Sequence, residues 1–146
     1  MSENKTVVFI GGLTNGMIVL EYLVKNKNVL LPLIITYPLD YNYPRTCDLG
    51  KIKKNDSDLL RDLNANKYVN KIKIINPDYI FVAGWSGLLN SELITIPKER
   101  TIGFHPSKLP QNKGRSVLAW QIEEGYKDTA LTMFYYNDVP DCGDII

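Results

Sequence analysis

The sequence is poor in the residues on which many kinds of functional site depend. Its 146 residues include two cysteines and a single histidine. Cys47 and Cys142 lie far apart and form no CxxC pair, which disfavours both a disulfide scaffold and a zinc site. The sequence therefore predicts no metal, and its cysteine usage is typical of a reducing, cytoplasmic setting. Any mechanism that needs an imidazole must use His105.

An excess of one charge and a long hydrophobic run are also lacking. The chain carries 17 basic and 16 acidic side chains, a net charge of +1, which gives no electrostatic reason to expect nucleic acid or an anionic membrane as a partner. No apolar run reaches the length of a membrane span, and the polar residues 1–6 do not resemble a signal peptide. We therefore expect a cytoplasmic protein with a small-molecule substrate.

Short apolar runs alternate with amphipathic segments along the whole length, and this alternation predicts an α/β fold. Continuous runs bounded by glycine or proline are typical of a parallel sheet that is buried on both faces. We expect one domain over residues 1–146, with an open, mostly parallel, Rossmann-like sheet and helices on both faces. The expected strands are residues 6–10, 29–36, 79–83, 100–104 and 130–136, and the expected helices are residues 15–27, 64–75, 91–96 and 115–124.

Some segments carry more specific expectations. Pro32 indicates a weakened or edge position in its strand, and residues 37–54 are expected to form a long loop of the kind that often binds ligands. In the last expected helix, Trp120 is predicted to lie in the core. Residues 143–146 resemble the beginning of a strand. This favours a fragment that is truncated at its C-terminus, and a very short last strand is the alternative.

The glycine-rich loop Gly11–Gly16 follows the first expected strand. A dinucleotide-binding fingerprint needs a second glycine where this sequence has Leu13, because the backbone must approach a pyrophosphate there. The loop is therefore interpreted as a tight turn between strand and helix. The alternative is a helix N-terminus that receives part of an anionic substrate.

His105 follows an expected strand, at the end where open parallel sheets bind their ligands. Asp141 lies in an acidic loop after another expected strand. A carboxylate beside an imidazole can fix its tautomer and balance its positive charge, which gives an acid/base pair near neutral pH. The sequence predicts such a pair if the two side chains meet. A turn-forming aspartate is the alternative reading of Asp141.

An ordered set of motifs makes the chain similar to a known family. The run GFHPSKLP at residues 103–110 is preceded by NPDYIFVAGWS at 76–86 and followed by Gly114, Arg115, Trp120, Gly125, Thr132 and the DCG of residues 141–143. This set resembles the folate-dependent formyltransferases, and most of all their sugar-nucleotide N-formyltransferase branch. His105 and Asp141 are 36 residues apart, about the separation that the family keeps between its catalytic histidine and aspartate.

The resemblance implies transfer of a formyl group from N10-formyltetrahydrofolate to the amine of a nucleotide-linked amino sugar. His105 would stabilise the oxyanion, and Asp141 would orient His105 and assist proton movement. The implied folate-binding residues are Trp85, Ser86, Gly87, Leu89, Asp138, Val139 and Pro140, and the implied substrate-binding residues are Ser107, Lys113 and Arg115. A core aromatic is the alternative for Trp85, and solvated surface charges are the alternative for Lys113 and Arg115.

Two features depart from the family pattern. Members usually carry an asparagine, as a third catalytic group, two residues before the histidine, where this chain has Gly103. Backbone, water or another side chain, with Asn112 and Asn137 as the nearby amides, would have to replace that donor. Otherwise the chain is a weakened or inactive binding module. The family's catalytic domain also continues with one more strand and helix. Activity on another small amine and assembly as a homodimer both stay open.

Overall fold

The computed structural model describes residues 4–42 and 44–146. The first three residues of the polar N-terminal segment, and residue 43 of the expected long loop, lie outside this description. Six strands form one sheet in the order β3-β2-β1-β4-β5-β6. The pairs from β3 to β5 are parallel, and β6 runs antiparallel to β5. The strands are β1 (Lys5–Gly11), β2 (Val29–Thr36), β3 (Asp58–Arg61), β4 (Tyr79–Ala83), β5 (Arg100–His105) and β6 (Thr132–Tyr135).

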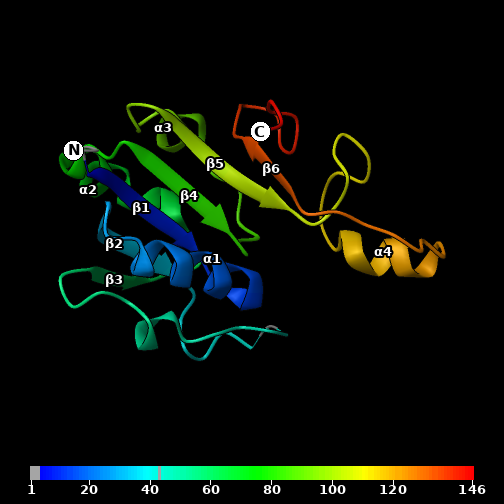
Figure 1. Cartoon of the computed structure of the whole chain (residues 1–146), viewed down its shortest axis with the longest axis horizontal. Coiled ribbons are helices and arrows are strands. Elements are labelled where there is room, and N and C mark those ends of the chain that lie inside the picture. Colours follow the sequence, from blue (N-terminus) through cyan, green and yellow to red (C-terminus); the bar gives the residue numbers. More distant parts are fainter. Residues whose placement is uncertain (1–3, 43) are drawn as a thin grey trace.

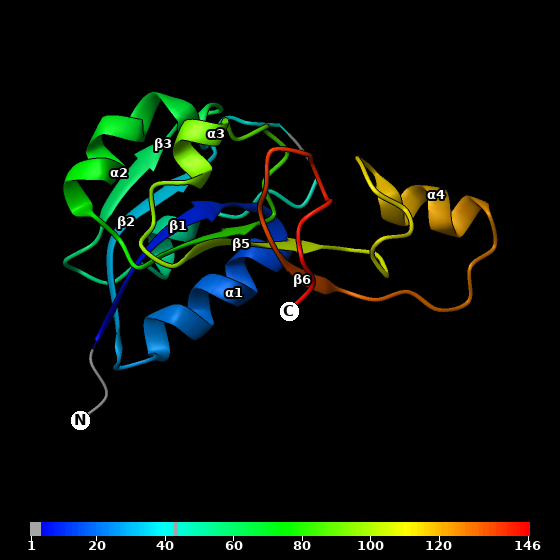
Figure 2. The same ribbon diagram turned by 90° about the horizontal axis from the view of Figure 1, so that it is seen from above.

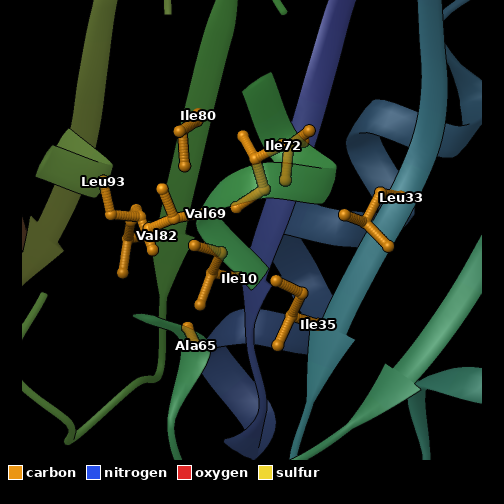
Figure 3. Close-up of a cluster of buried hydrophobic side chains, with 10 residues drawn as sticks. Ile10, Leu33, Ile35, Ala65, Val69, Ile72, Ile80, Val82 and Leu93 are labelled. Atoms are coloured by element: carbon orange, nitrogen blue, oxygen red, sulfur yellow. The ribbon is translucent and has the colours of Figure 1, made fainter. Parts of the chain in front are cut away.

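Helices cover both faces of the sheet, as the sequence predicts (Figure 2). Helix α1 (Leu13–Lys25) lies on one face, and α2 (Val69–Ile75) and α3 (Ser91–Ile94) lie on the other. Successive side chains of a strand point to opposite faces, so β1 contributes to two separate cores. Val8 and Ile10 pack with α2 (Figure 3), whereas Val7 and Phe9 pack with α1. This double burial explains why the expected strands are apolar without alternation.

The order of the strands reverses between β1 and β4. From β1 the chain moves outward through β2 to β3, and then returns to β4 on the other side of β1. Loops leave the carboxyl ends of two adjacent strands in opposite directions at such a point, which opens a crevice where α/β proteins bind ligands. The fold therefore places its binding edge at the ends of β1, β4 and the neighbouring β5.

Strand β3 was not predicted. It holds two leucines between Asp58 and Arg61 and lies at the edge of the sheet, so the continuous apolar pattern of a central strand is missing.

The pairing of β2 explains how the strand accommodates Pro32. The β1–β2 register is irregular opposite Leu30–Leu33, and β3 pairs with β2 only from Leu33 onward, so the missing N–H of Pro32 costs no ladder bond on that side.

The prediction that Trp120 lies in the core is wrong. Helix α4 (Val117–Glu123) projects away from the sheet beyond β5 and β6 (Figure 1), and Trp120 is 59% exposed. Only Val117 and Gln121 of this helix are buried, and Ile122 is 77% exposed. At the C-terminal end, residues 143–146 contribute one isolated bridge, from Ile145 to Phe134, instead of a ladder.

The connecting segments follow the turn chemistry of the sequence. Asn64 caps the 3₁₀ turn η2 (Ala65–Tyr68) by accepting a hydrogen bond from the Asn66 N–H. Asn76 ends α2 in the left-handed conformation. The long loop after β2 contains one short 3₁₀ turn, η1 (Leu49–Lys51). Within the described residues, no helix has the length and apolar content needed to cross a lipid bilayer.

Candidate active site

The structure brings His105 and Asp141 together at the carboxyl end of β5. His105 is the last residue of β5, and Asp141 lies in the loop that follows β6, the neighbouring strand. The His105 Nδ1 atom is 3.5 Å from Asp141 Oδ1, and the two side chains are 9% and 20% exposed. At this separation the imidazole and the carboxylate are in direct polar contact. The pairing that the sequence predicts is therefore present in the fold.

The Asp141 carboxylate is fixed by a second contact. Its Oδ2 accepts a hydrogen bond from the Gly114 backbone N–H at 2.8 Å, which leaves Oδ1 for His105. The neighbouring residues join the same two loops, since Lys113 Nζ donates to Cys142 Sγ at 2.9 Å. The loop after β5 and the loop after β6 thus hold each other. Asp141 itself has a φ of 55°, a conformation that aspartate tolerates better than most residues.

The other ring nitrogen of His105 faces a backbone oxygen. Nε2 is 2.9 Å from the carbonyl oxygen of Asn112. A carbonyl oxygen can only accept, so this contact requires a proton on Nε2. His105 therefore presents an N–H donor toward an oxygen atom. Of the two amides considered as replacement donors, Asn112 meets His105 through its backbone carbonyl, and Asn137 uses its side-chain oxygen to accept the Val139 N–H.

The space beside His105 that a side chain at position 103 would fill is occupied. A Cβ atom built on Gly103 would overlap Cε2 of Tyr136 and lie 3.0 Å from two ring carbons of Phe134. The rings of Phe134 and Tyr136 stack at 5.3 Å between centroids. Burial, together with the nearby Asp141 and Tyr37, raises the pKa of the Tyr136 phenol above its ordinary value. Two aromatic rings from β6 and its end therefore stand where the family pattern places an amide.

Trp85 lies in the turn after β4, close to the crevice where the strand order reverses. Its ring stacks on Tyr37 at 4.5 Å between centroids, with 11° between the planes. The Tyr37 hydroxyl accepts the Ser86 backbone N–H at 2.7 Å and lies 3.1 Å from Ser86 Oγ. Tyr37 thus ties the start of the long loop to the turn that carries the first four predicted folate contacts. Of these, Ser86 is exposed, whereas Trp85, Gly87 and Leu89 are partly buried.

The second predicted folate segment, Asp138–Pro140, forms an exposed turn after β6. Asp138 lines a cavity of about 420 Å³ together with Tyr136 and Thr101. A further cavity of about 450 Å³ lies under the long loop, between Tyr37 and Arg61. Neither of these two cavities has His105 or Asp141 in its lining.

The three predicted substrate-binding residues differ in their surroundings. Ser107 is fully buried; its hydroxyl donates to the Gln111 carbonyl, and its own carbonyl accepts the Thr132 hydroxyl. These bonds give Ser107 the place of a loop-positioning residue, which corrects the interpretation of its side chain as a substrate contact. Lys113 and Arg115 are both exposed, so they stay available to an anionic group. Lys113 also lies beside the site through its contact with Cys142.

The glycine loop after β1 serves close packing. A Cβ atom on Gly12 would overlap the Tyr37 ring, and one on Gly11 would overlap the Ala83 carbonyl. This packing agrees with the tight turn that was predicted, and it leaves the face of Gly12 covered by an aromatic ring instead of open to an anion. Tyr37 and Tyr136 are the site residues that sequence reasoning missed. Tyr37 begins the loop that was expected to bind ligands, and Tyr136 ends the expected strand 130–136. Neither position by itself marked the residue as part of the site.

Comparison with known proteins gives concordant results. A family model described as formyl transferase matches residues 51–146. A methionyl-tRNA formyltransferase from Clostridioides difficile is 36% identical over 80 residues, which are 55% of this chain and 26% of that protein. The chain thus spans about a quarter of the length of this curated relative.

Solved structures match the fold over almost the whole chain. Phosphoribosylglycinamide formyltransferase from Bacillus halodurans matches with a TM-score of 0.77 and 20% identity, covering 97% of this chain and 77% of that one. A sugar N-formyltransferase from a Shewanella species matches with a TM-score of 0.66 and 19% identity, covering 97% of this chain and 55% of that one.

Among residues 4–42 and 44–146, no group of three or more His, Cys, Asp or Glu side chains is arranged to hold a metal ion.

Proposed function

Because the chain belongs to the formyl transferase family, we propose that it transfers the formyl group of N10-formyltetrahydrofolate to a primary amine at the His105–Asp141 pair. The observation that carries this proposal is the geometry of His105. Its Nδ1 faces the Asp141 carboxylate, and its Nε2–H points toward an oxygen acceptor. Both residues lie within the segment that the family model matches.

The reaction joins the acceptor nitrogen to the formyl carbon. As the amine attacks, the electron pair of the formyl C=O bond moves to oxygen and creates an oxyanion, to which His105 Nε2–H donates a hydrogen bond. The bond from carbon to N10 then breaks, N10 gains a proton and the acceptor nitrogen loses one. A preorganised donor at such an oxyanion contributes roughly 10²–10³ in rate. Asp141, through its contact with Nδ1, holds the imidazole in the orientation that directs Nε2–H toward the oxyanion.

One contact has to change during this reaction. The Asn112 carbonyl oxygen already accepts from His105 Nε2, in the direction in which the formyl oxygen would have to lie. The formyl oxygen therefore replaces the Asn112 carbonyl, which requires the backbone at Asn112 to move away from His105 Nε2. The Gly114–Asp141 hydrogen bond lies further along the loop after β5 and keeps the carboxylate in place.

The stack of Trp85 on Tyr37 supports a folate site in the crevice. A pterin is a flat heteroaromatic ring, and such rings bind between aromatic or apolar side chains with a few polar groups that fix their orientation. The turn at Trp85, Ser86 and Gly87, with Leu89, offers such an apolar surface. Asp138, Val139 and Pro140, in the turn after β6, are exposed and offer backbone groups and one carboxylate.

For the acceptor, we propose the amine of an amino-sugar nucleotide. Support comes from the sequence motifs around Trp85 and Gly114. The charge distribution also favours this acceptor over a tRNA, since seven basic side chains are paired with carboxylates and a tRNA needs a basic surface for its phosphates. Exposed Lys113 and Arg115 are suited to a diphosphate. Methionyl-tRNA is the second candidate, because the 36% identical relative is a methionyl-tRNA formyltransferase.

The proposal is tested by incubating the chain with N10-formyltetrahydrofolate and each of three acceptors: an amino-sugar nucleotide, methionyl-tRNA and phosphoribosylglycinamide. Formylation of the amino-sugar nucleotide alone supports the proposal in full, and formylation of methionyl-tRNA alone changes the acceptor. If no acceptor is formylated while folate still raises the melting temperature, the chain is a binding module. His105→Ala, which removes the Nε2 donor, is the control for each transfer.

A further inference from the structure

Gly103 and His105 are alternate residues of β5, so their side-chain directions share one face of the sheet. A side chain at position 103 would therefore stand beside the imidazole. The hydroxyl-bearing half of the Tyr136 ring takes this space, because the ring carbon nearest to the Gly103 Cβ direction is Cε2, which is bonded to the carbon that carries the hydroxyl. The phenol thus lies on the catalytic face of β5.

The direction of the Tyr136 ring follows from the strand register. The Tyr136 backbone N–H donates to the Thr101 carbonyl at 2.9 Å, whereas its Cε2 reaches Gly103. The ring therefore lies along β5 and extends toward His105, with the hydroxyl at the end of the ring that faces His105. Stacking on Phe134 holds the ring in this direction, and Phe134 itself is 2% exposed. Such a buried support limits the positions that the phenol can take.

The electrostatic surroundings keep this hydroxyl protonated. Burial raises the pKa of Tyr136, and the negative charge of Asp141 and the phenol of Tyr37 raise it further. A phenol that stays protonated at the pH of the reaction offers an O–H donor and no negative charge that would oppose an oxyanion.

We propose that the Tyr136 hydroxyl donates the second hydrogen bond to the formyl oxyanion, beside the bond from His105 Nε2. Tyr136, directly after β6, then supplies the donor that Gly103 cannot supply from β5. This inference rests on the formyl transfer proposed above. No proton leaves Tyr136 in the step, since the hydroxyl strengthens its hydrogen bond as charge develops on the formyl oxygen and relaxes when the C–N10 bond breaks.

Tyr136→Phe tests the inference, because it removes one oxygen atom and keeps the stacked ring. We expect kcat for formyl transfer to fall by about 10²–10³, with the Kd of N10-formyltetrahydrofolate and the melting temperature close to those of the unaltered chain. A merely structural role for Tyr136 would not produce this separation of kcat from binding. Tyr135→Phe is the matched control, since Tyr135 points to the other face and contacts Arg100; its kcat stays within about twofold.

The outcomes separate this inference from the proposed function. If the unaltered chain transfers the formyl group and Tyr136→Phe has the same kcat, the role of Tyr136 is overturned and the proposed function stands. Absence of transfer by the unaltered chain, with every acceptor, contradicts the proposed function and the inference with it.

A rescue experiment adds a second test. Tyr136→Ala opens the space over Gly103, and Gly103→Asn in the same chain returns an amide donor to that space. We expect the double variant to regain at least about tenfold in kcat over Tyr136→Ala. An equal kcat in the two variants contradicts the idea that this space holds an oxyanion donor.

Discussion

Gly103 shows how much the role of one residue depends on neighbours that are distant in sequence. From the sequence alone, Gly103 is a missing asparagine, and restoring the amide is the obvious experiment. In the fold, the space that a side chain at position 103 would occupy is filled by the rings of Tyr136 and Phe134, which are more than 30 positions away in the sequence. The absence of a side chain at position 103 is therefore what allows the Tyr136 ring to lie beside His105.

Gly103→Asn alone is predicted to destabilise the chain by about 1–3 kcal/mol, because the new side chain overpacks a filled space. Urea denaturation measures this loss. The matched control is the same substitution in the Tyr136→Ala background, where the penalty is expected to shrink because the overlapping ring is gone. Equal penalties in the two backgrounds would show that Tyr136 does not occupy this space.

Trp85 provides a spectroscopic test of the folate site. The chain has two tryptophans, and Trp120, on α4, is exposed and distant from the crevice. We expect folate binding to quench the fluorescence of Trp85, since a pterin ring would stack near it. The quenching should persist in Trp120→Phe and disappear in Trp85→Phe. A signal that depends on Trp120 instead would place the folate elsewhere.

Among the elements, β4 is tied to the start of β1 by Asp78. Its Oδ2 accepts the Thr6 N–H at 2.7 Å, and its Oδ1 lies 3.2 Å from Lys98 Nζ. The hydrogen bond from Thr6, supported by Lys98, lowers the pKa of Asp78 below its ordinary value. The crevice lies at the carboxyl ends of these two central strands. The Asp78 contact therefore helps to fix the position of β4 and of the turn after it, which contains Trp85.

Asp78→Asn is predicted to lower the free energy of unfolding by about 1–2 kcal/mol at pH 7, because a charge-assisted hydrogen bond becomes a neutral one. A lowered carboxyl pKa stabilises the fold above the pKa of the unfolded chain, and this stabilisation is lost as the pH falls through the folded value. The difference between the two chains should therefore narrow below about pH 4.

Urea denaturation at pH 7 and pH 3 measures the effect of Asp78→Asn. Asp58→Asn is the control. Asp58 lies on the edge strand β3 and pairs with the exposed Lys71 of α2, and exposed pairs contribute little to stability. A pH-independent difference for Asp78→Asn would contradict the role of its charge.

Helix α4 shows where sequence reasoning fails at the scale of an element. The pattern of residues 115–124 predicts a helix, and a helix begins there at Val117. The pattern does not say whether another element covers the apolar side. In this fold α4 stands apart from the sheet, with Ile122 77% exposed. Burial of a helix face depends on its neighbours, and no local signal in the sequence identifies them.

At the scale of the whole molecule, the repeated pattern of buried strands and helices was enough to predict a mostly parallel sheet, although not its edge strand β3. The run at residues 79–83 is apolar at every position, and in residues 6–10 only Thr6 is polar. Such runs are typical of strands that are covered on both faces. The carboxyl edge of that sheet then brings His105 and Asp141 together. Tyr37 and Tyr136 were not predictable in the same way, because their contacts depend on how loops from different strands fold over that edge.

The central claim is that His105 carries formyl transfer, and isotope labelling tests it most directly. N10-formyltetrahydrofolate with a ¹³C-labelled formyl carbon is mixed with the amine acceptor, and ¹³C NMR follows the label. We predict that the unaltered chain moves the label from N10 to the acceptor nitrogen as a formamide, and that His105→Ala slows this step by at least about 10²-fold. A label that stays on the folate, or moves equally fast without the imidazole, would contradict the claim.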